Sequence, residues 1–168
     1  MAPDDVRKLV DDHAEDITRD IVAAWRRVAT DEVWLSLPPS MTFDDLPNVL
    51  RAITDAALAP NFGEHDCRRI IHFSALHGEH RNQEGFLESF IHTEYYLTRS
   101  SLWDFLRDKL DDADAVRAIT RADAAITLAT QAALRGFHSQ TFRQRGDWPA
   151  ALDRLLHDAP IISRQPGP

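Results

Sequence analysis

The sequence predicts an all-α protein, an antiparallel helical bundle of about five major helices plus a short C-terminal helix. Apolar residues recur at intervals of three or four along almost the whole chain, which is the repeat of one face of an α-helix. Alternating β-branched or aromatic stretches bounded by Asn-Gly or Asp-Gly turns, the usual signs of strands and hairpins, are missing from the sequence. The 168 residues are 43% hydrophobic, enough to bury a core. We therefore expect one helical sensor or regulatory domain over residues 1–160 and a flexible tail over 161–168.

The N-terminal part of the chain predicts two helices separated by a break. The first runs from Asp4 to about Ala29, and acidic residues gather at its start, where they interact favourably with the helix dipole. Paired prolines interrupt the pattern within residues 34–40, and a second, shorter helix ends near Pro60. The apolar positions of the two helices are Val6, Val10, Ile17, Ile21, Ala24 and Val28, then Phe43, Leu46, Leu50, Ile53 and Ala57.

The middle of the chain predicts two antiparallel helices joined at Gly85. The first covers Glu64 to Gln83, and the second covers Phe86 to about Leu110. Because the link at Gly85 is short, the second helix must turn back along the first. Their predicted inner faces are Ile70, Phe73, Ser74, His77 and Arg81 on the first, and Phe86, Phe90, Glu94, Leu97, Ser101 and Phe105 on the second.

The last long helix is predicted from about Ala113 to Gly146. It would be roughly 50 Å long unless Gly136 bends it, which is more than a compact bundle of this size needs. A short amphipathic helix is expected to begin at Trp148. The residues of the long helix predicted to point inwards are Val116, Ile119, Ile126, Ala133 and Phe137.

Charge and composition exclude several classes of protein. Lys and Arg number 19 against 27 Asp and Glu, and the net charge of −8 has the wrong sign for binding nucleic acid or anionic lipid. No apolar run approaches the roughly 20 residues of a membrane-spanning helix. The N-terminus lacks the basic and apolar regions of a signal peptide, and the one cysteine, Cys67, cannot form an internal disulfide. We expect a cytoplasmic protein that binds neither nucleic acid nor a membrane.

Three charged or titratable residues form the candidate site, which we call the polar seam: His77, Arg81 and Glu94. His77 and Arg81 are four positions apart on one helix face, and Glu94 interrupts an apolar stripe on the next helix. His77 and Glu94 lie at similar distances from Gly85 along the chain, so an antiparallel hairpin brings them to the same height. A carboxylate in an apolar stripe is costly unless it is paired, and Arg81 or His77 is the available partner.

The pattern around the polar seam resembles the N-terminal domain of the RsbRD family, the stressosome-type co-antagonists, which also precedes sensor histidine kinases. This resemblance implies a helical regulatory domain that senses a signal and transmits it to an output module such as a kinase or a STAS (sulfate-transporter-and-anti-sigma-antagonist) domain. The sequence contains neither module, so we expect a stand-alone relative or an excised fragment. The residues that carry the resemblance are His77, Arg81, Gly85 and Phe86, followed by Glu94, Tyr95, Leu97 and Arg99.

We therefore expect a non-enzymatic input domain of a bacterial stress-response or two-component pathway. No serine or cysteine nucleophile is paired with a base by spacing, and no phosphate-binding glycine loop is present. The polar seam with Tyr95 and Arg99 is the candidate ligand-binding or signal-transmitting site, and the alternative is a buried network that fixes the hairpin register. A homodimer through the first and last long helices is expected, because the alanines of the last one allow close approach.

A small-ligand, haem or metal-binding bundle is the alternative function. Four of the eight histidines, His65, His72, His77 and His80, lie close together in sequence. At about 100° per residue, His72 and His77 diverge by about 140°, so one helix cannot direct these rings at one ion. No metal and no cofactor are expected, although haem needs only one axial histidine.

Three further residues are expected to have minor roles. His13 and Asp123 are predicted on the inner faces of the first and last long helices, as paired core or interface groups. Cys67 lies near a helix start, where the helix dipole can lower the pKa of a thiol, and a redox-sensing role is a minor alternative for it.

Overall fold

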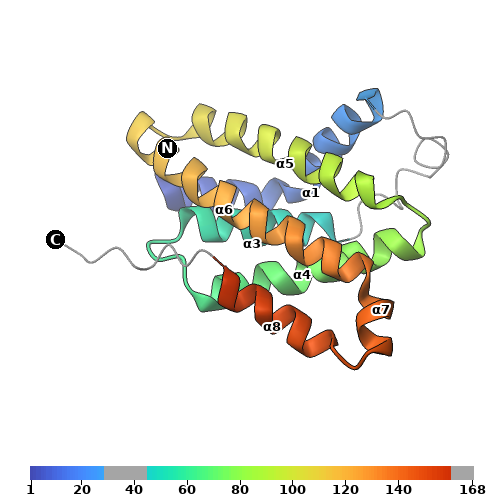
Figure 1. The fold of residues 1–168 in the computed structure, drawn as a ribbon. Coiled ribbons are helices and arrows are strands. Elements are labelled where there is room, and N and C mark those ends of the chain that lie inside the picture. Colours follow the sequence, from blue (N-terminus) through green and yellow to red (C-terminus); the bar gives the residue numbers. More distant parts are fainter. Residues whose placement is uncertain (29–44, 160–168) are drawn as a thin grey trace.

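The computed structural model describes residues 1–28 and 45–159, and every regular element in these ranges is helical. The all-α prediction is therefore confirmed for this part of the chain. The predicted break at residues 34–40, the position of Phe43 and the tail from residue 161 lie outside the described residues. The elements, labelled as in Figure 1, are α1 (Pro3–Val28), α3 (Leu46–Leu58), α4 (Glu64–Gln83), α5 (Glu88–Lys109), α6 (Asp112–Phe137), α7 (Ser139–Gln144) and α8 (Trp148–Asp158).

Helix α6 is the centre of the bundle. It packs against α3, α4, α5 and α8, whereas α1 packs against α3 and α5. In Figure 1, α5 follows the upper edge of the bundle, α8 follows the lower edge, and α6 crosses between them. The antiparallel pair α4 and α5 therefore has its main backbone contacts with α6, and long side chains connect the pair directly.

The closest approach of two helices is between α4 and α6. A Cβ atom added at Gly78 would fall on the backbone carbonyl of Ala133, and one added at Gly136 would fall on the carbonyl of Ala75. Each helix thus contributes one glycine that faces an alanine of the other. The crossing therefore requires glycine at positions 78 and 136, each of which faces an alanine of the other helix.

The alanines of α6 are buried within the chain itself. Ala122, Ala125, Ala129, Ala132 and Ala133 are fully covered by neighbouring helices. The expected use of these alanines in a homodimer interface is therefore wrong, because α4 and the other neighbours already occupy that face.

The last long helix is shorter than predicted. It ends at Phe137 instead of continuing to Gly146, and His138 leaves the helical conformation at φ −96° and ψ 16°. The chain then turns back through α7, which lets Arg143 bind Glu79 of α4. With 26 residues α6 has the same length as α1, so the expectation of an oversized helix is also wrong.

Several positions that the sequence predicts to point inwards lie outside the buried faces of their helices. Val116 is 67% exposed, and the buried face of α6 consists mainly of the alanines. On α5, Leu97, Ser101 and Phe105 lie at the edge of the core. The buried residues of this helix are Phe90, Ile91, Glu94, Tyr95, Thr98, Leu102 and Leu106. His13 is exposed at a kink in α1, where its φ of −122° departs from helical geometry.

No helix in residues 1–28 and 45–159 is both long and apolar enough to cross a lipid bilayer.

The α4–α6 crossing gives a stability prediction. Gly78→Ala or Gly136→Ala should lower the free energy of unfolding by about 1–3 kcal/mol or more, because the new methyl group overlaps a backbone carbonyl and the two helices must separate. Gly63→Ala is the matched control, since the nearest atom to its new Cβ is 4.0 Å away, and it should cost less than about 1 kcal/mol. Urea unfolding followed by circular dichroism measures the free energy of unfolding of each variant. Equal losses of stability in Gly63→Ala and Gly78→Ala would contradict the close approach of α4 and α6.

Candidate functional site

The link between α4 and α5 positions the polar seam. Residues 84–87 connect the helices, and Gly85 adopts φ +84°, the left-handed conformation that glycine enters at low cost. The N–H of Phe86 donates to the carbonyl of Arg81 over 3.0 Å, which closes the end of α4. The chain therefore reverses directly after the last turn of α4, and the first turns of α5 face His77 and Arg81.

Glu94 binds both partners of the polar seam. Its Oε2 lies 2.7 Å from Nε2 of His77, and its Oε1 accepts a hydrogen bond from Nη2 of Arg81 over 3.1 Å. All three side chains are 0% exposed. The predicted burial and pairing of Glu94 are thus confirmed, with one carboxylate oxygen for each partner.

A second carboxylate, from Glu84, completes the charge arrangement. Nη1 of Arg81 donates to Oε2 of Glu84 over 2.8 Å, and the guanidinium group lies 5.1 Å from the ring centre of Phe86. Arg81 is therefore held between two carboxylates and covered by an aromatic ring. Sequence reasoning missed Glu84, although its spacing of three from Arg81 on a helix end is typical of an ion pair.

Glu94 and Arg81 keep their charges at neutral pH. Burial alone would raise the pKa of Glu94, but Arg81 and His77 outweigh this effect and lower that pKa from 4.5 to about 2. Burial likewise opposes the charge of Arg81, while Glu94 and Glu84 raise its pKa above the usual value. Both groups are consequently ionised inside the bundle.

Tyr95 belongs to the same cluster. It is 1% exposed, and its ring meets the His77 ring edge-on with 6.3 Å between the centres. Burial raises the pKa of the Tyr95 hydroxyl, and a contact with the Ser74 hydroxyl partly offsets this. Nδ1 of His77 and the Thr98 hydroxyl have no hydrogen-bond partner among the described residues. The cluster is polar but closed to solvent.

Arg99 does not join the polar seam. It faces α6, where its Nε lies 2.9 Å from Oδ1 of Asp123 and its Nη2 donates to the Thr127 hydroxyl over 3.2 Å. Asp123 was predicted to be an inner residue, but its side chain is 48% exposed. The structure therefore separates the five candidate residues into His77, Arg81, Glu94 and Tyr95 at the α4–α5 contact and Arg99 at the α5–α6 contact.

The second half of α4 also contacts α3 and α7. His80 Nδ1 lies 2.8 Å from Oδ2 of Asp45 at the start of α3, and Arg143 of α7 donates to both oxygens of Glu79. Neither pair is predicted from the sequence, because the partners are far apart along the chain. The polar residues of α4 thus connect it to three other helices.

The clustered histidines do not converge. His65 and His72 are exposed, His77 is inside, and His80 pairs with Asp45. Within the described ranges, no group of three His, Cys, Asp or Glu side chains is arranged to hold a metal ion. Cys67 is buried, and burial raises the pKa of its thiol, which is opposite to the lowering that its position near a helix start predicts.

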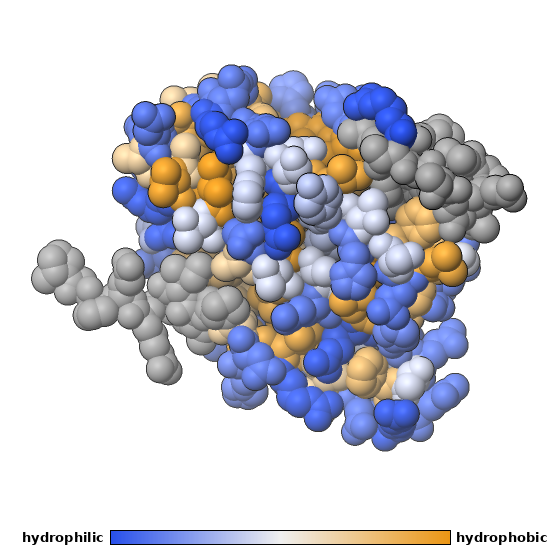
Figure 2. Space-filling view, turned by 45° about the horizontal axis from the view of Figure 1, so that its top comes forward, coloured by the Kyte–Doolittle hydropathy of each residue, from blue (hydrophilic) through white to orange (hydrophobic). Residues whose placement is uncertain are grey.

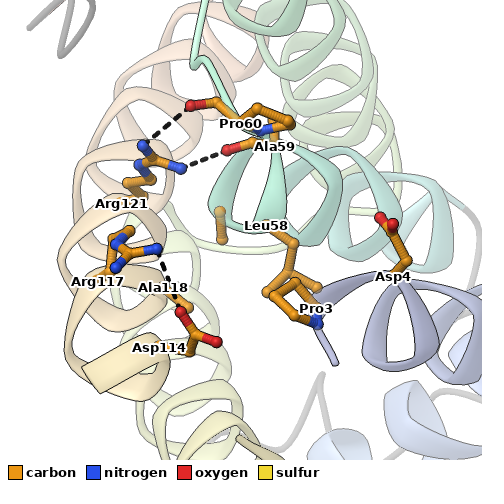
Figure 3. Close-up of a pocket in the computed structure, with 10 residues that line it drawn as sticks. Pro3, Asp4, Leu58, Ala59, Pro60, Asp114, Arg117, Ala118 and Arg121 are labelled. Atoms are coloured by element: carbon orange, nitrogen blue, oxygen red, sulfur yellow. Dashed lines mark hydrogen bonds and ion pairs between the residues drawn. The ribbon is translucent and has the colours of Figure 1, made fainter. Parts of the chain in front are cut away.

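A surface pocket of about 270 Å³ lies where the start of α1, the end of α3 and the start of α6 meet (Figure 3). Arg121 donates to the carbonyls of Ala59 and Pro60, and Arg117 pairs with Asp114 over 3.2 Å. Arg121 therefore satisfies carbonyls left at the C-terminal end of α3. We therefore assign a structural role to Arg121 and no ligand to this pocket.

Comparison of the chain with protein-family models, curated proteins and solved structures gave no match. The resemblance to RsbRD N-terminal domains accordingly depends on the residues of the polar seam and the α4–α5 link, and it stays a prediction.

Loss of one partner of the polar seam should be disproportionately costly. Glu94→Leu should lower the free energy of unfolding by about 3–5 kcal/mol, because two buried groups lose their shared carboxylate. The double variant Glu94→Leu/Arg81→Leu should lose less than the sum of the two single variants, since it removes both charges. Glu88→Leu is the control on the same helix, with a half-exposed carboxylate whose pairing with His138 should contribute less than about 1 kcal/mol. Additive losses in urea unfolding would show that the residues do not interact.

The lowered pKa of Glu94 makes stability depend on pH. Between about pH 4.5 and pH 2 the unfolded carboxyl binds a proton that the folded one does not, so stability falls as the pH falls. Glu94→Gln removes this titration. The slope of the free energy of unfolding against pH should therefore be smaller in this variant by up to about 1.4 kcal/mol per pH unit. Urea unfolding at a series of acidic pH values measures both slopes. Parallel curves for the two proteins would mean that Glu94 titrates normally.

Proposed function

We propose that this chain is a non-enzymatic regulatory module that receives a signal and passes it to a protein partner or output module by a change in helix packing. The observation that carries the proposal is the closure of the polar seam: its charged side chains are fully buried and bind one another. The resemblance to RsbRD N-terminal domains points the same way and suggests a bacterial stress-response or two-component pathway with a kinase or STAS-type output.

Burial of the polar seam argues against catalysis at this site. A general acid or base must come within hydrogen-bonding distance of its substrate, about 2.6–3.2 Å. His77 and Glu94 are 0% exposed, and each oxygen of Glu94 already has a partner. A substrate would have to separate α4 from α5 before it reached either group.

The same arrangement suits signal transmission. Arg81 lies between Glu94 of α5 and Glu84 of the link, so a shift of α5 must exchange or break charged hydrogen bonds. Such exchange favours discrete alternative packings over continuous deformation. Glu79, two residues before Arg81, is bound to Arg143 of α7, which connects the seam to the helices at the C-terminal end. We infer that α7 and α8 carry the change towards the output.

Partner docking or dimerisation would use surfaces other than the alanine face of α6. The large apolar residues exposed on the α4–α5 link, α5 and α6 are Leu87, Tyr96 and Val116. Figure 2 shows hydrophobic atoms in separate small patches among hydrophilic ones on the face in view. Small patches favour a reversible contact over an obligate interface.

A kinase fusion tests the proposal. The chain is joined to the dimerisation and catalytic core of a histidine kinase, and autophosphorylation is compared for wild type, Glu94→Gln and the exposed control Glu88→Gln. Glu94→Gln keeps the shape of the side chain but removes its charge, and it should change the rate about fivefold or more. The control should match wild type. Circular dichroism confirms that each fusion is folded, and equal rates in all three would refute transmission through the seam.

A small-ligand function is favoured by one feature, a groove between α5 and α6 that includes Tyr95.

A further inference from the structure

The α5–α6 groove is a surface pocket of about 250 Å³ that borders the polar seam. Its walls include Tyr95, Tyr96 and Arg99 on α5 and Thr130, Gln131 and Leu134 on α6. Tyr95 is shared, because the same ring meets His77 inside the bundle. A molecule in the groove would therefore lie beside Tyr95, which belongs to the seam cluster and is itself only 1% exposed.

Hydrogen-bond donors predominate among the free polar groups of the groove. Arg99 is 31% exposed, and its Nε and Nη2 bind Asp123 and Thr127, which leaves Nη1 available. Tyr96 and Gln131 are exposed and have no hydrogen bond or ion pair with another described residue. The hydroxyl of Thr130 already donates to a backbone carbonyl of α6, so it can only accept. A guanidinium with an amide and a phenol nearby suits a carboxylate.

The other residues that line the groove are Tyr95, Tyr96 and Leu134, together with His92 and Thr127. Its volume is below the range of about 300–1,000 Å³ that is usual for drug-sized ligands, so a ligand with a single ring is the appropriate size.

We propose that the α5–α6 groove binds a small aromatic carboxylate, with its carboxylate on Arg99 and Gln131 and its ring against Tyr96 and Leu134. Binding itself is independent of the regulatory role. The further step, in which the ligand acts on the polar seam through Tyr95, rests on the proposed function and would make this ligand class the signal.

Benzoate is a suitable probe, with benzamide as its neutral counterpart of nearly the same shape. Titrations of the full chain are followed by ¹H–¹⁵N correlation spectra. Benzoate should cause saturable shifts that cluster on α5 and α6 around the groove, and benzamide should bind about tenfold more weakly or worse, because it lacks the charge that Arg99 recognises.

Two variants in the groove and one outside it identify the binding residues. Arg99→Gln removes the cation, and Gln131→Glu adds a negative charge at an exposed position, so each should weaken benzoate binding about tenfold or more. Arg117→Gln is the matched control, because Arg117 is an exposed arginine of α6 that does not line the groove. It should bind benzoate like wild type.

Three results would overturn the assignment: equal binding of benzamide and benzoate, unchanged affinity in both groove variants, or scattered shifts that do not saturate. The kinase fusion separates this inference from the proposed function. Benzoate that binds in the groove but leaves the fusion kinase unchanged supports the site and overturns its role as the signal. A kinase that responds to Glu94→Gln but a chain that ignores benzoate overturns the site and leaves the regulatory function standing.

Discussion

The bundle depends on keeping a carboxylate ionised where no water reaches it. Glu94 tolerates full burial because His77 and Arg81 each bind one of its oxygens, and Arg81 in turn is held by Glu84. None of these groups can be removed alone without leaving a buried polar atom unsatisfied. The direct contact of α5 with α4 is thus made by charge pairing, whereas the crossing of α4 and α6 is set by shape.

The shape-determined part centres on α6. Its buried face is mostly alanine and glycine, so α4 approaches it until backbone meets backbone at Gly78 and Gly136. This close packing brings α4, α5 and α6 together and leaves little freedom at their common centre. The polar seam and the α5–α6 groove lie on either side of Tyr95, so a rigid central helix supports both.

The sequence predicted the features that depend on local spacing. Helix α4 was predicted with its observed bounds, and the pairing of Glu94 followed from the hairpin at Gly85. The turn at His138 was missed because the α6 pattern continues through it, and the contact that accompanies the turn, Arg143 with Glu79, joins distant residues. The resemblance grouped Arg99 with the polar seam. Arg99 follows Glu94 by five positions, however, so the two side chains point to different sides of α5, and Arg99 faces Asp123 of α6.

The order of the helices along the chain has a consequence for folding. α4 and α5 are neighbours in sequence, yet both pack mainly on α6, which follows them. While α6 is still being synthesised, the α4–α5 hairpin lacks its main packing partner, although α1 and α3 are already present, so we expect water to solvate Glu94 and Arg81 at that stage. Their dehydration coincides with the docking of α6, which makes burial of the charge cluster a late and cooperative event.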